Sequence, residues 1–88
     1  MDNQELVLKK GNAAPIGATV TKEGVNFSLF SKNATAVSLL LFNDVEDLFP
    51  YREIILDRNY NRTYHYWHIQ IEGLKIGQLY AYKVNGPN

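Results

Sequence analysis

Apolar and polar residues alternate along most of this sequence, which is the periodicity of a β-strand. Residues 36–42 alternate with apolar side chains on both faces, so they are predicted to form a central strand covered on both sides. Residues 18–31 alternate on either side of Lys22-Glu23-Gly24, which predicts a hairpin in which Gly24 supplies the turn conformation. Helical spacing at i, i+3, i+4 and i+7 appears nowhere. The chain is therefore predicted to be all-β.

Turn signals divide the rest of the chain into further short strands. These are predicted at residues 52–57, 64–73 and 79–84, with polar loops at 43–51 and 57–63. A brief apolar run at residues 6–8 is compatible with a short edge strand, while residues 1–14 as a whole are expected to be a flexible N-terminal segment. Six or seven strands at intervals of about ten residues are typical of an antiparallel β-sandwich, here assigned to residues 15–88.

Composition argues against several classes of protein. The 88 residues give room for one small domain. Nine lysine and arginine residues balance nine aspartate and glutamate residues, so the basic surface that binds nucleic acid is not expected. No apolar run approaches the roughly 18 to 20 residues of a membrane-spanning helix. The absence of cysteine and of a signal-like N-terminus indicates a cytoplasmic protein, and we expect neither nucleic acid nor a membrane among its partners.

Residues that could support catalysis or metal binding are few and poorly placed. His65 and His68 are three positions apart, so on a strand their side chains point to opposite faces and cannot share one metal ion. Asp44, Glu46 and Asp47 lie in a predicted loop, which does not hold two carboxylates at a fixed separation in an apolar setting. The serines have no neighbouring base. We therefore expect no catalytic residue, no metal and no cofactor in this chain.

Some aromatic residues of the last two predicted strands are expected to be core anchors. Trp67 falls in phase with Ile69 and Ile71, which places its indole between the two sheets of a sandwich. Tyr80 and Tyr82 alternate in the last strand and are assigned to the interior on the same grounds.

A second group of residues is a candidate contact surface. Tyrosines in the loop before Trp67, or on the strand face opposite to it, are the aromatic residues expected to be exposed. Flat apolar rings edged with hydroxyl groups suit the C–H face and the polar rim of a sugar, although a contact with another domain uses the same side chains. The candidate contact residues are Tyr60, Asn61, Arg62, Tyr64 and Tyr66.

Six short motifs follow one another in a specific order. They are Pro15-x-Gly17-Ala18, Gly24-Val25-Asn26-Phe27, Leu29-Phe30-Ser31, Asn61-Arg62-Thr63, Trp67-His68 and Tyr80-x-Tyr82-x-Val84-x-Gly86-Pro87. Together they resemble the N-terminal domain of bacterial and plant isoamylase-type glycogen debranching enzymes, a module also classed with the isoamylase-like carbohydrate-binding modules. The resemblance covers roughly residues 15–87, which is nearly the whole chain.

The resemblance implies an immunoglobulin-like β-sandwich of the early-set type at the front of a much longer glycoside hydrolase. Such an enzyme hydrolyses α-1,6 branch linkages in glycogen or related glucans. Its catalytic part is a (β/α)₈ barrel with an aspartate nucleophile and a glutamate acid, and it would begin after Pro87. The resemblance therefore implies that this fragment is noncatalytic, with the barrel of its parent chain and α-glucan, such as glycogen or maltooligosaccharide, as partners.

The chain departs from the family pattern at positions that hold glucan in some relatives. Those relatives have a lysine in the last strand, a tryptophan just past it and another tryptophan after the strand equivalent to residues 37–42. The corresponding positions here are Ala81, Asn88 and a place near Asp44 or Val45, and none has the expected residue. Loss of two stacking rings removes about 1 to 3 kcal/mol each, by analogy with base stacking on aromatics. Tight glucan binding by the domain alone is therefore not expected.

Three functions remain open from the sequence. The favoured one is a noncatalytic accessory domain that packs on the catalytic barrel and helps to shape the substrate groove. The second is an autonomous α-glucan-binding module that stacks sugar on its tyrosines. The third is an immunoglobulin-like protein-interaction domain unrelated to glucan. The pair Tyr64-His65 replaces the small residue and acid that debranching enzymes commonly have there, so this loop is expected to be stiffer and more aromatic than usual.

Overall fold

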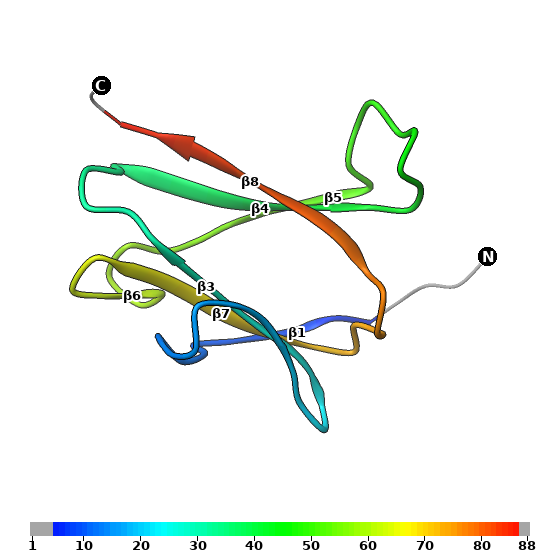
Figure 1. The fold of residues 1–88 in the computed structure, drawn as a ribbon, viewed down its shortest axis with the longest axis horizontal. Coiled ribbons are helices and arrows are strands. Elements are labelled where there is room, and N and C mark those ends of the chain that lie inside the picture. The colour runs from blue at the N-terminus through cyan, green and yellow to red at the C-terminus, as the bar shows by residue number, and fades with distance from the viewer. Residues whose placement is uncertain (1–4, 87–88) are drawn as a thin grey trace.

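A computed structural model describes residues 5–86 and shows two antiparallel sheets packed face to face (Figure 1). The strands are β1 (Val7–Lys9), β2 (Gly17–Val20), β3 (Gly24–Phe30), β4 (Ala36–Phe42), β5 (Arg52–Ile55), β6 (Arg62–Thr63), β7 (Tyr66–Glu72) and β8 (Leu79–Asn85). Within the described residues there is no helix that could span a membrane. The expectations for residues 1–4, Pro87 and Asn88 lie outside the described residues.

One sheet has the order β1-β7-β3-β2, with β6 also paired to β7, and the other has the order β5-β4-β8. Every pairing between these strands is antiparallel. The prediction of an all-β antiparallel sandwich is confirmed. The loop predicted at 57–63 is shorter than expected, because its last two residues form β6 and pair with the start of β7.

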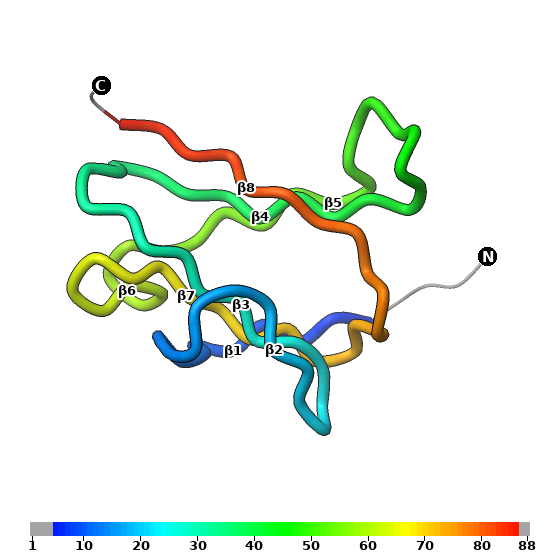
Figure 2. Tube along the Cα trace, in the orientation of Figure 1, coloured from blue at the N-terminus to red at the C-terminus, as the bar shows by residue number. Residues whose placement is uncertain are grey.

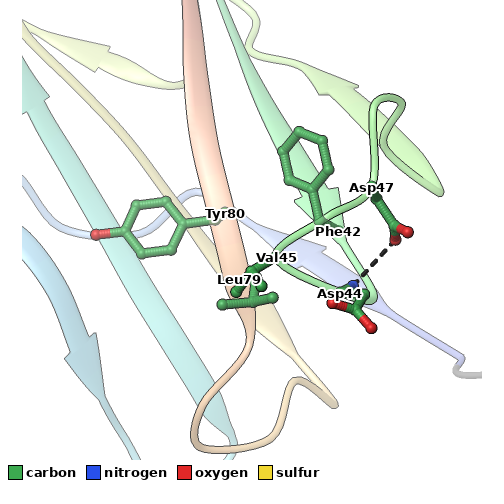
Figure 3. A pocket seen from close by; sticks show the side chains of 6 residues that line it. All are labelled: Phe42, Asp44, Val45, Asp47, Leu79 and Tyr80. Atoms are coloured by element: carbon green, nitrogen blue, oxygen red, sulfur yellow. Dashed lines mark hydrogen bonds between the residues drawn. The ribbon is translucent and has the colours of Figure 1, made fainter.

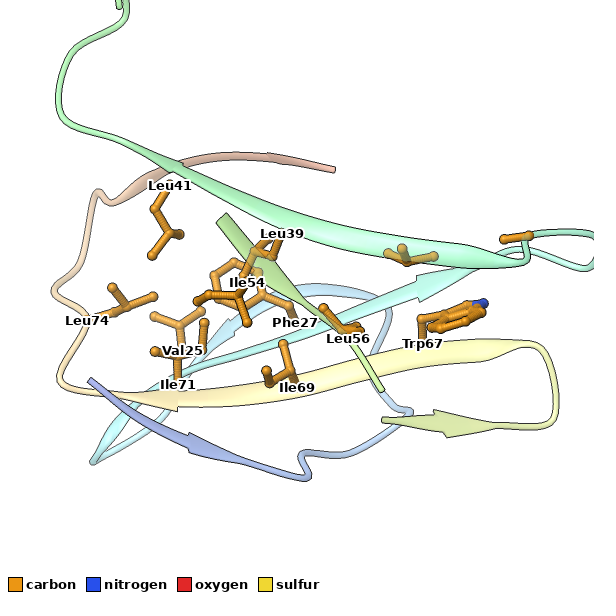
Figure 4. Packing of buried hydrophobic residues seen from close by; sticks show 12 residues of the cluster. Val25, Phe27, Leu39, Leu41, Ile54, Leu56, Trp67, Ile69, Ile71 and Leu74 are labelled. Carbon is orange, nitrogen blue, oxygen red and sulfur yellow. The ribbon is translucent and has the colours of Figure 1, made fainter. Parts of the chain in front are cut away.

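The core lies between the two sheets and is built by alternate residues of β3, β4, β5 and β7 (Figure 4). Trp67 is 1% exposed and lies at the end of the cluster nearest the β6–β7 turn. The central position predicted for residues 36–42 is confirmed, since β4 lies between β5 and β8. On its outer face Ser38 is buried but Leu40 and Phe42 are only partly buried, so the predicted cover on both sides is complete for the inner face and partial for the outer one.

The β2–β3 hairpin forms where the alternation predicts it, but Gly24 has another role from the one expected. Gly24 is not among the glycines with positive φ, so it does not supply an unusual turn conformation. It lies instead against the β7 backbone, where a Cβ atom on Gly24 would overlap the carbonyl oxygen of Ile71. The requirement for glycine at this position is therefore one of space between β3 and β7.

Residues 10–14 cross the outer face of the first sheet, because β1 pairs with β7 on one edge and β2 pairs with β3 on the other. The tube in Figure 2 shows this crossover segment as the blue trace between β1 and β2. Asn26 accepts a hydrogen bond from the Asn12 N–H at 2.9 Å and donates one to the Asn12 carbonyl at 3.0 Å. Ser28 donates to the Ala13 carbonyl at 2.6 Å. The outward polar side chains of β3 thus provide hydrogen-bond partners for backbone groups of the crossover segment.

His68 holds the same crossover from the neighbouring strand. Its Nδ1 lies 2.7 Å from the Lys10 carbonyl and its Nε2 lies 2.8 Å from the Thr63 hydroxyl, and the side chain is fully buried. The apolar run at residues 6–8 predicted a short edge strand, which is confirmed by β1 at the edge of the sheet. Within the described part of the N-terminal segment, residues 5–14 thus consist of this edge strand and a hydrogen-bonded crossover.

Candidate functional site

Four aromatic rings gather where β3 ends and β7 begins, and we call Phe30, Tyr64, His65 and Tyr66 the aromatic surface. Phe30 and Tyr66 face each other across the strands, with ring centroids 5.1 Å apart and planes at 67°. His65 lies edge-on to Phe30 at 5.9 Å, and Tyr64 lies over His65 at 3.9 Å. Edge-to-face rings at these distances attract one another, so the four side chains hold one another in place.

Tyr64 is the most exposed of these rings and has an unusual backbone. It opens the two-residue turn between β6 and β7, because Thr63 pairs with Tyr66. Its φ is 59°, in the left-handed region, and its side chain is 74% exposed. Hairpin loops of this length favour Gly, Asn or Asp at such positions, since a Cβ atom costs about 1 to 2 kcal/mol there. The turn therefore presents a large exposed ring on a strained backbone.

The other three candidate contact residues do not join this surface. Asn61 is 6% exposed, because its side-chain oxygen accepts from the Asp57 N–H at 3.0 Å and its amide points to the Lys10 carbonyl at 3.4 Å. Asn61 therefore holds the loop and the crossover inside the molecule and lacks the exposure expected of a contact residue. Tyr60 is exposed, with the Lys10 ammonium 6.0 Å from its ring.

Arg62 is turned toward the core. Arg62 and Trp67 are cross-strand partners, and the guanidinium carbon lies 5.3 Å from the centroid of the indole ring. The Arg62 Nε and the Trp67 Nε1 are both buried without a hydrogen-bond partner among the described residues. Arg62 therefore covers the end of the core, and the five candidate contact residues are not brought together as one site.

The residues assigned to the core from the last strand lie at its margin. Trp67 is inside the core, and Tyr82 packs against it while partly buried. Tyr80 is 38% exposed and touches the core through an edge contact with Phe27, with ring centroids 4.9 Å apart. The prediction that Tyr80 is a buried core anchor is therefore wrong, because no strand of the opposite sheet covers its side chain fully.

The cause is that the sandwich is open along one side, where the edge strands β2 and β8 end their sheets. We call the inward-facing residues of these two strands the open edge. Val84 is 47% exposed although it is in phase with the buried Val37. A shallow hollow of about 70 Å³ separates the two strands. The open edge comprises Ala18, Val20, Tyr80, Tyr82 and Val84. It is an apolar surface of the kind that another protein surface commonly covers.

A larger hollow, of about 270 Å³, lies where β4 meets the following loop (Figure 3). It is lined by Phe42, Asp44, Val45, Asp47, Leu79 and Tyr80. Figure 3 shows the loop folded back on itself, with the Asp44 N–H donating to the Asp47 carboxylate at 3.0 Å. The carboxylates thus order their own loop and are exposed to solvent.

Two of the positions compared above on the basis of the family resemblance can be located in the structure. Ala81 is exposed on the outer face of β8, where the neighbouring Lys83 makes a 3.9 Å ion pair with Glu53. Asp44 and Val45 are exposed in the loop beside the 270 Å³ hollow. Neither place presents an aromatic ring at the substituted positions.

The phenol of Tyr82 gives a test of the open edge. Burial raises the pKa of Tyr82 from 10.0 to about 12, and the charge of Tyr80 acts in the same direction. The unfolded chain loses this proton at lower pH than the folded chain. The resulting stabilisation is present below pH 10 and lost as the pH rises through 12. The Tyr82→Phe variant lacks this titration, so its free energy of unfolding should exceed that of the parent chain increasingly across this range.

At neutral pH the same substitution removes a buried hydroxyl that has no hydrogen-bond partner among residues 5–86. We expect Tyr82→Phe to raise the free energy of unfolding by about 1 kcal/mol, since no bond is lost and the desolvation of the hydroxyl is avoided. Urea denaturation of both chains at neutral and alkaline pH measures both effects. A less stable Phe variant at neutral pH would mean that the hydroxyl is bonded.

An all-β sandwich that exposes aromatic rings at one turn and apolar side chains along an open edge has the surfaces of a module that contacts a ligand or another domain. Comparison with known protein families identifies which kind of module this chain is. The family model of carbohydrate-binding module 48, the isoamylase N-terminal domain, matches residues 15–88. The chain belongs to this family, which confirms the resemblance stated from the six motifs.

Curated relatives agree with this membership. Isoamylase 1 of rice (Oryza sativa subsp. japonica), a chloroplastic protein, is 44% identical over 78 residues, which are 86% of this chain and 10% of that protein. The glycogen debranching enzyme of Serratia proteamaculans (strain 568) is 42% identical over 80 residues, or 91% of this chain and 11% of that protein. Isoamylase 3 of rice, also chloroplastic, is 37% identical and covers 99% of this chain and 12% of that protein. The chain thus spans about a tenth of these relatives.

Proposed function

We propose that this chain is the noncatalytic N-terminal domain of an α-1,6-glucan debranching enzyme and that it packs against the catalytic (β/α)₈ barrel of the same parent polypeptide. The observation that carries the proposal is the open edge, where inward-facing residues of two strands remain exposed. Relatives that are isoamylases and glycogen debranching enzymes are about ten times longer than the aligned segment, which supports a large companion domain.

The open edge favours a protein domain as its occupant. Its two most exposed valines, Val20 at 56% and Val84 at 47%, have no hydroxyl or charge that would orient a sugar. The buried Tyr82 hydroxyl without a partner could be satisfied by a carbonyl or carboxylate at the margin of the docked domain. Coverage by the barrel would remove this apolar surface from water, with a gain of about 25 cal/mol per Å² of apolar area.

The test begins with the coding sequence that follows codon 88 and with the polypeptide that the complete gene encodes. We expect that polypeptide to release linear chains from glycogen by α-1,6 hydrolysis, measured as new reducing ends. Val84→Glu should lower its activity and its melting temperature, because the charge would be buried against the barrel. Ile55→Glu is the matched control, since Ile55 is exposed on the outer face of β5, away from the open edge.

A complete gene without a hydrolase domain would refute the proposed function. Equal effects of the two glutamate substitutions would keep the enzyme assignment and refute the open edge as the interface.

A second function, contact with α-glucan, is favoured by the aromatic surface, whose exposed rings lie away from the open edge on the outer face of the first sheet.

A further inference from the structure

We propose that the aromatic surface binds a glucose ring of an α-glucan chain, with Tyr64 as the stacking platform. This inference rests on the proposed function and places the glucan contact at Phe30, Tyr64, His65 and Tyr66. It locates that contact away from the 270 Å³ hollow and from the open edge.

The site is an uncovered part of an otherwise covered sheet face. Phe30 pairs with Tyr66 and Tyr66 pairs with Thr63, so these three side chains form one row across β3, β7 and β6. The next row, which contains Ser28 and His68, lies beneath the crossover segment and is fully buried. In the row of Phe30 and Tyr66, by contrast, Phe30 is 47% exposed and Tyr66 is partly buried.

The rings are organised before any ligand arrives. Phe30 lies edge-on to both His65 and Tyr66, at centroid distances of 5.9 and 5.1 Å. The His65 carbonyl also accepts a hydrogen bond from the Ser31 N–H at 2.9 Å, which ties the turn to the end of β3. The protein side chains therefore lose little conformational entropy when a ligand stacks on this surface. A low entropy cost favours the binding of a small ligand with few strong contacts, such as a sugar.

Tyr64 is the residue whose placement the fold itself does not explain. A tyrosine in the left-handed region is less favourable than glycine, and this ring has its main contact with His65 while most of it faces water. Strained residues that the surrounding structure keeps in place are concentrated at ligand-binding sites. What tyrosine adds here is an exposed aromatic face with a hydroxyl at its rim.

The chemistry of the surface suits a neutral, hydroxyl-rich ring. The C–H face of glucose packs on an aromatic face, and the phenol groups of Tyr64 and Tyr66 can donate to and accept from sugar hydroxyls. The aromatic surface itself carries no acid or permanent cation, so an anionic ligand has no dedicated partner among its four side chains. An α-glucan is the neutral ligand that agrees with membership in a carbohydrate-binding family.

The test is a titration of the 88-residue chain with maltoheptaose as the probe, and with cellohexaose as the β-linked comparison. Two-dimensional NMR spectra record which residues change their signals. We expect maltoheptaose to shift the signals of the aromatic surface at millimolar concentration. Tyr64→Gly should weaken binding about tenfold, by analogy with the loss of one stacking ring. Its melting temperature should stay within a few degrees of the parent value, because glycine relieves the backbone strain while the contact with His65 is lost.

Phe49→Ser is the matched control, since Phe49 is an exposed aromatic residue in the β4–β5 loop and lies outside the aromatic surface. We expect this variant to bind maltoheptaose like the parent chain. Phe30→Ala gives a second variant within the surface, and its binding should fall in the same direction.

Three results would overturn the inference: no binding at millimolar maltoheptaose, equal binding by the parent chain and Tyr64→Gly, or loss of binding in Phe49→Ser alone. The last result would place the glucan at the loop. If Tyr64→Gly instead lowers the stability of the full-length enzyme without changing sugar binding, the aromatic surface is an interdomain contact. Each of these results is compatible with α-1,6 hydrolysis by the full-length enzyme, so the inference can fail while the proposed function stands.

Discussion

Replacing Trp67 by alanine is expected to lower the free energy of unfolding by about 3 to 5 kcal/mol, the range for a large aromatic residue removed from a core. The indole is 1% exposed and packs between the sheets, so its loss leaves a cavity at the end of the core beside Arg62. The chain has no cysteine and hence no disulfide to hold the sheets together. Since native domains have a total stability of about 5 to 15 kcal/mol, a domain at the lower end of this range would lose most of its stability through this single change.

Urea denaturation followed by the far-ultraviolet circular dichroism of the backbone measures the loss of stability. This signal can be used although the variant lacks the tryptophan. Trp67→Phe separates packing from hydrogen bonding, because it keeps an aromatic ring and removes the Nε1–H group that has no partner among the described residues. Its loss should be less than half that of the alanine variant. Tyr60→Ala is the exposed control and should change stability by about 0.5 kcal/mol or less. Equal stability of Trp67→Ala and Tyr60→Ala would contradict the packing described for the core.

The two-residue period of the sequence was sufficient to predict the sheets and the buried tryptophan. Residues 36–42 became the central strand β4, and Trp67 lies in the core with Ile69 and Ile71, in the phase that the sequence indicates. This works because alternation reports directly which side chains share a face. Alternation within residues 18–31 is also enough to predict the hairpin. The role of Gly24 could not be predicted in this way, because it is the β7 backbone, far along the chain, that leaves no room for a Cβ atom.

Periodicity could not predict how much of each face is covered. Tyr80 and Val84 have the phase of core residues, yet they are exposed because β8 and β2 are edge strands of opposite sheets. Phase is a property of one strand, whereas cover depends on how far the opposite sheet extends. The sequence therefore assigned Tyr80 to the interior, and the open edge became visible only from the arrangement of the strands.

The crossover segment was missed for a related reason. Asn26, Ser28 and His68 on the outward faces of β3 and β7 are buried under residues 10–13, which the alternation of single strands does not indicate. A signal was present, because these outward positions carry small or hydrogen-bonding side chains where an exposed sheet commonly has lysine or glutamate. The same segment accounts for Asn61, whose amide reaches the Lys10 carbonyl and so lies inside the molecule.

The aromatic surface was predicted in part. Tyr64 and Tyr66 were expected to be exposed near the turn, and Tyr64 is exposed whereas Tyr66 is partly buried. Phe30 and His65 were not identified, because they join the surface through the pairing of β3 with β7 and through the turn geometry. No local pattern marks Phe30, which has the position of an ordinary strand residue in the sequence. The departure at Tyr64-His65 was the useful signal, since a bulky pair in a two-residue turn requires an unusual backbone.

Gly11→Ala is expected to lower the free energy of unfolding by about 2 to 5 kcal/mol, as the sum of left-handed backbone strain and overpacking. Gly11 has φ of 78° and lies in the crossover directly on the β7 backbone. A Cβ atom there would be 2.7 Å from the Gln70 nitrogen and 2.8 Å from the Asn26 side-chain oxygen. The crossover would have to lift, which would break the hydrogen bonds that bury Asn26 and His68.

Gly77→Ala isolates the backbone term, because Gly77 has φ of 92° and a Cβ atom there would meet nothing within 4 Å. This control should lose only about 1 to 2 kcal/mol. The difference between the two alanine variants in urea denaturation measures how firmly the crossover lies on the sheet. Faster amide exchange at Asn26 and His68 in Gly11→Ala, but not in Gly77→Ala, should accompany the loss. Equal destabilisation by the two variants would mean that residues 10–13 move away from β7 at little cost, and that the polar row beneath them is held in some other way.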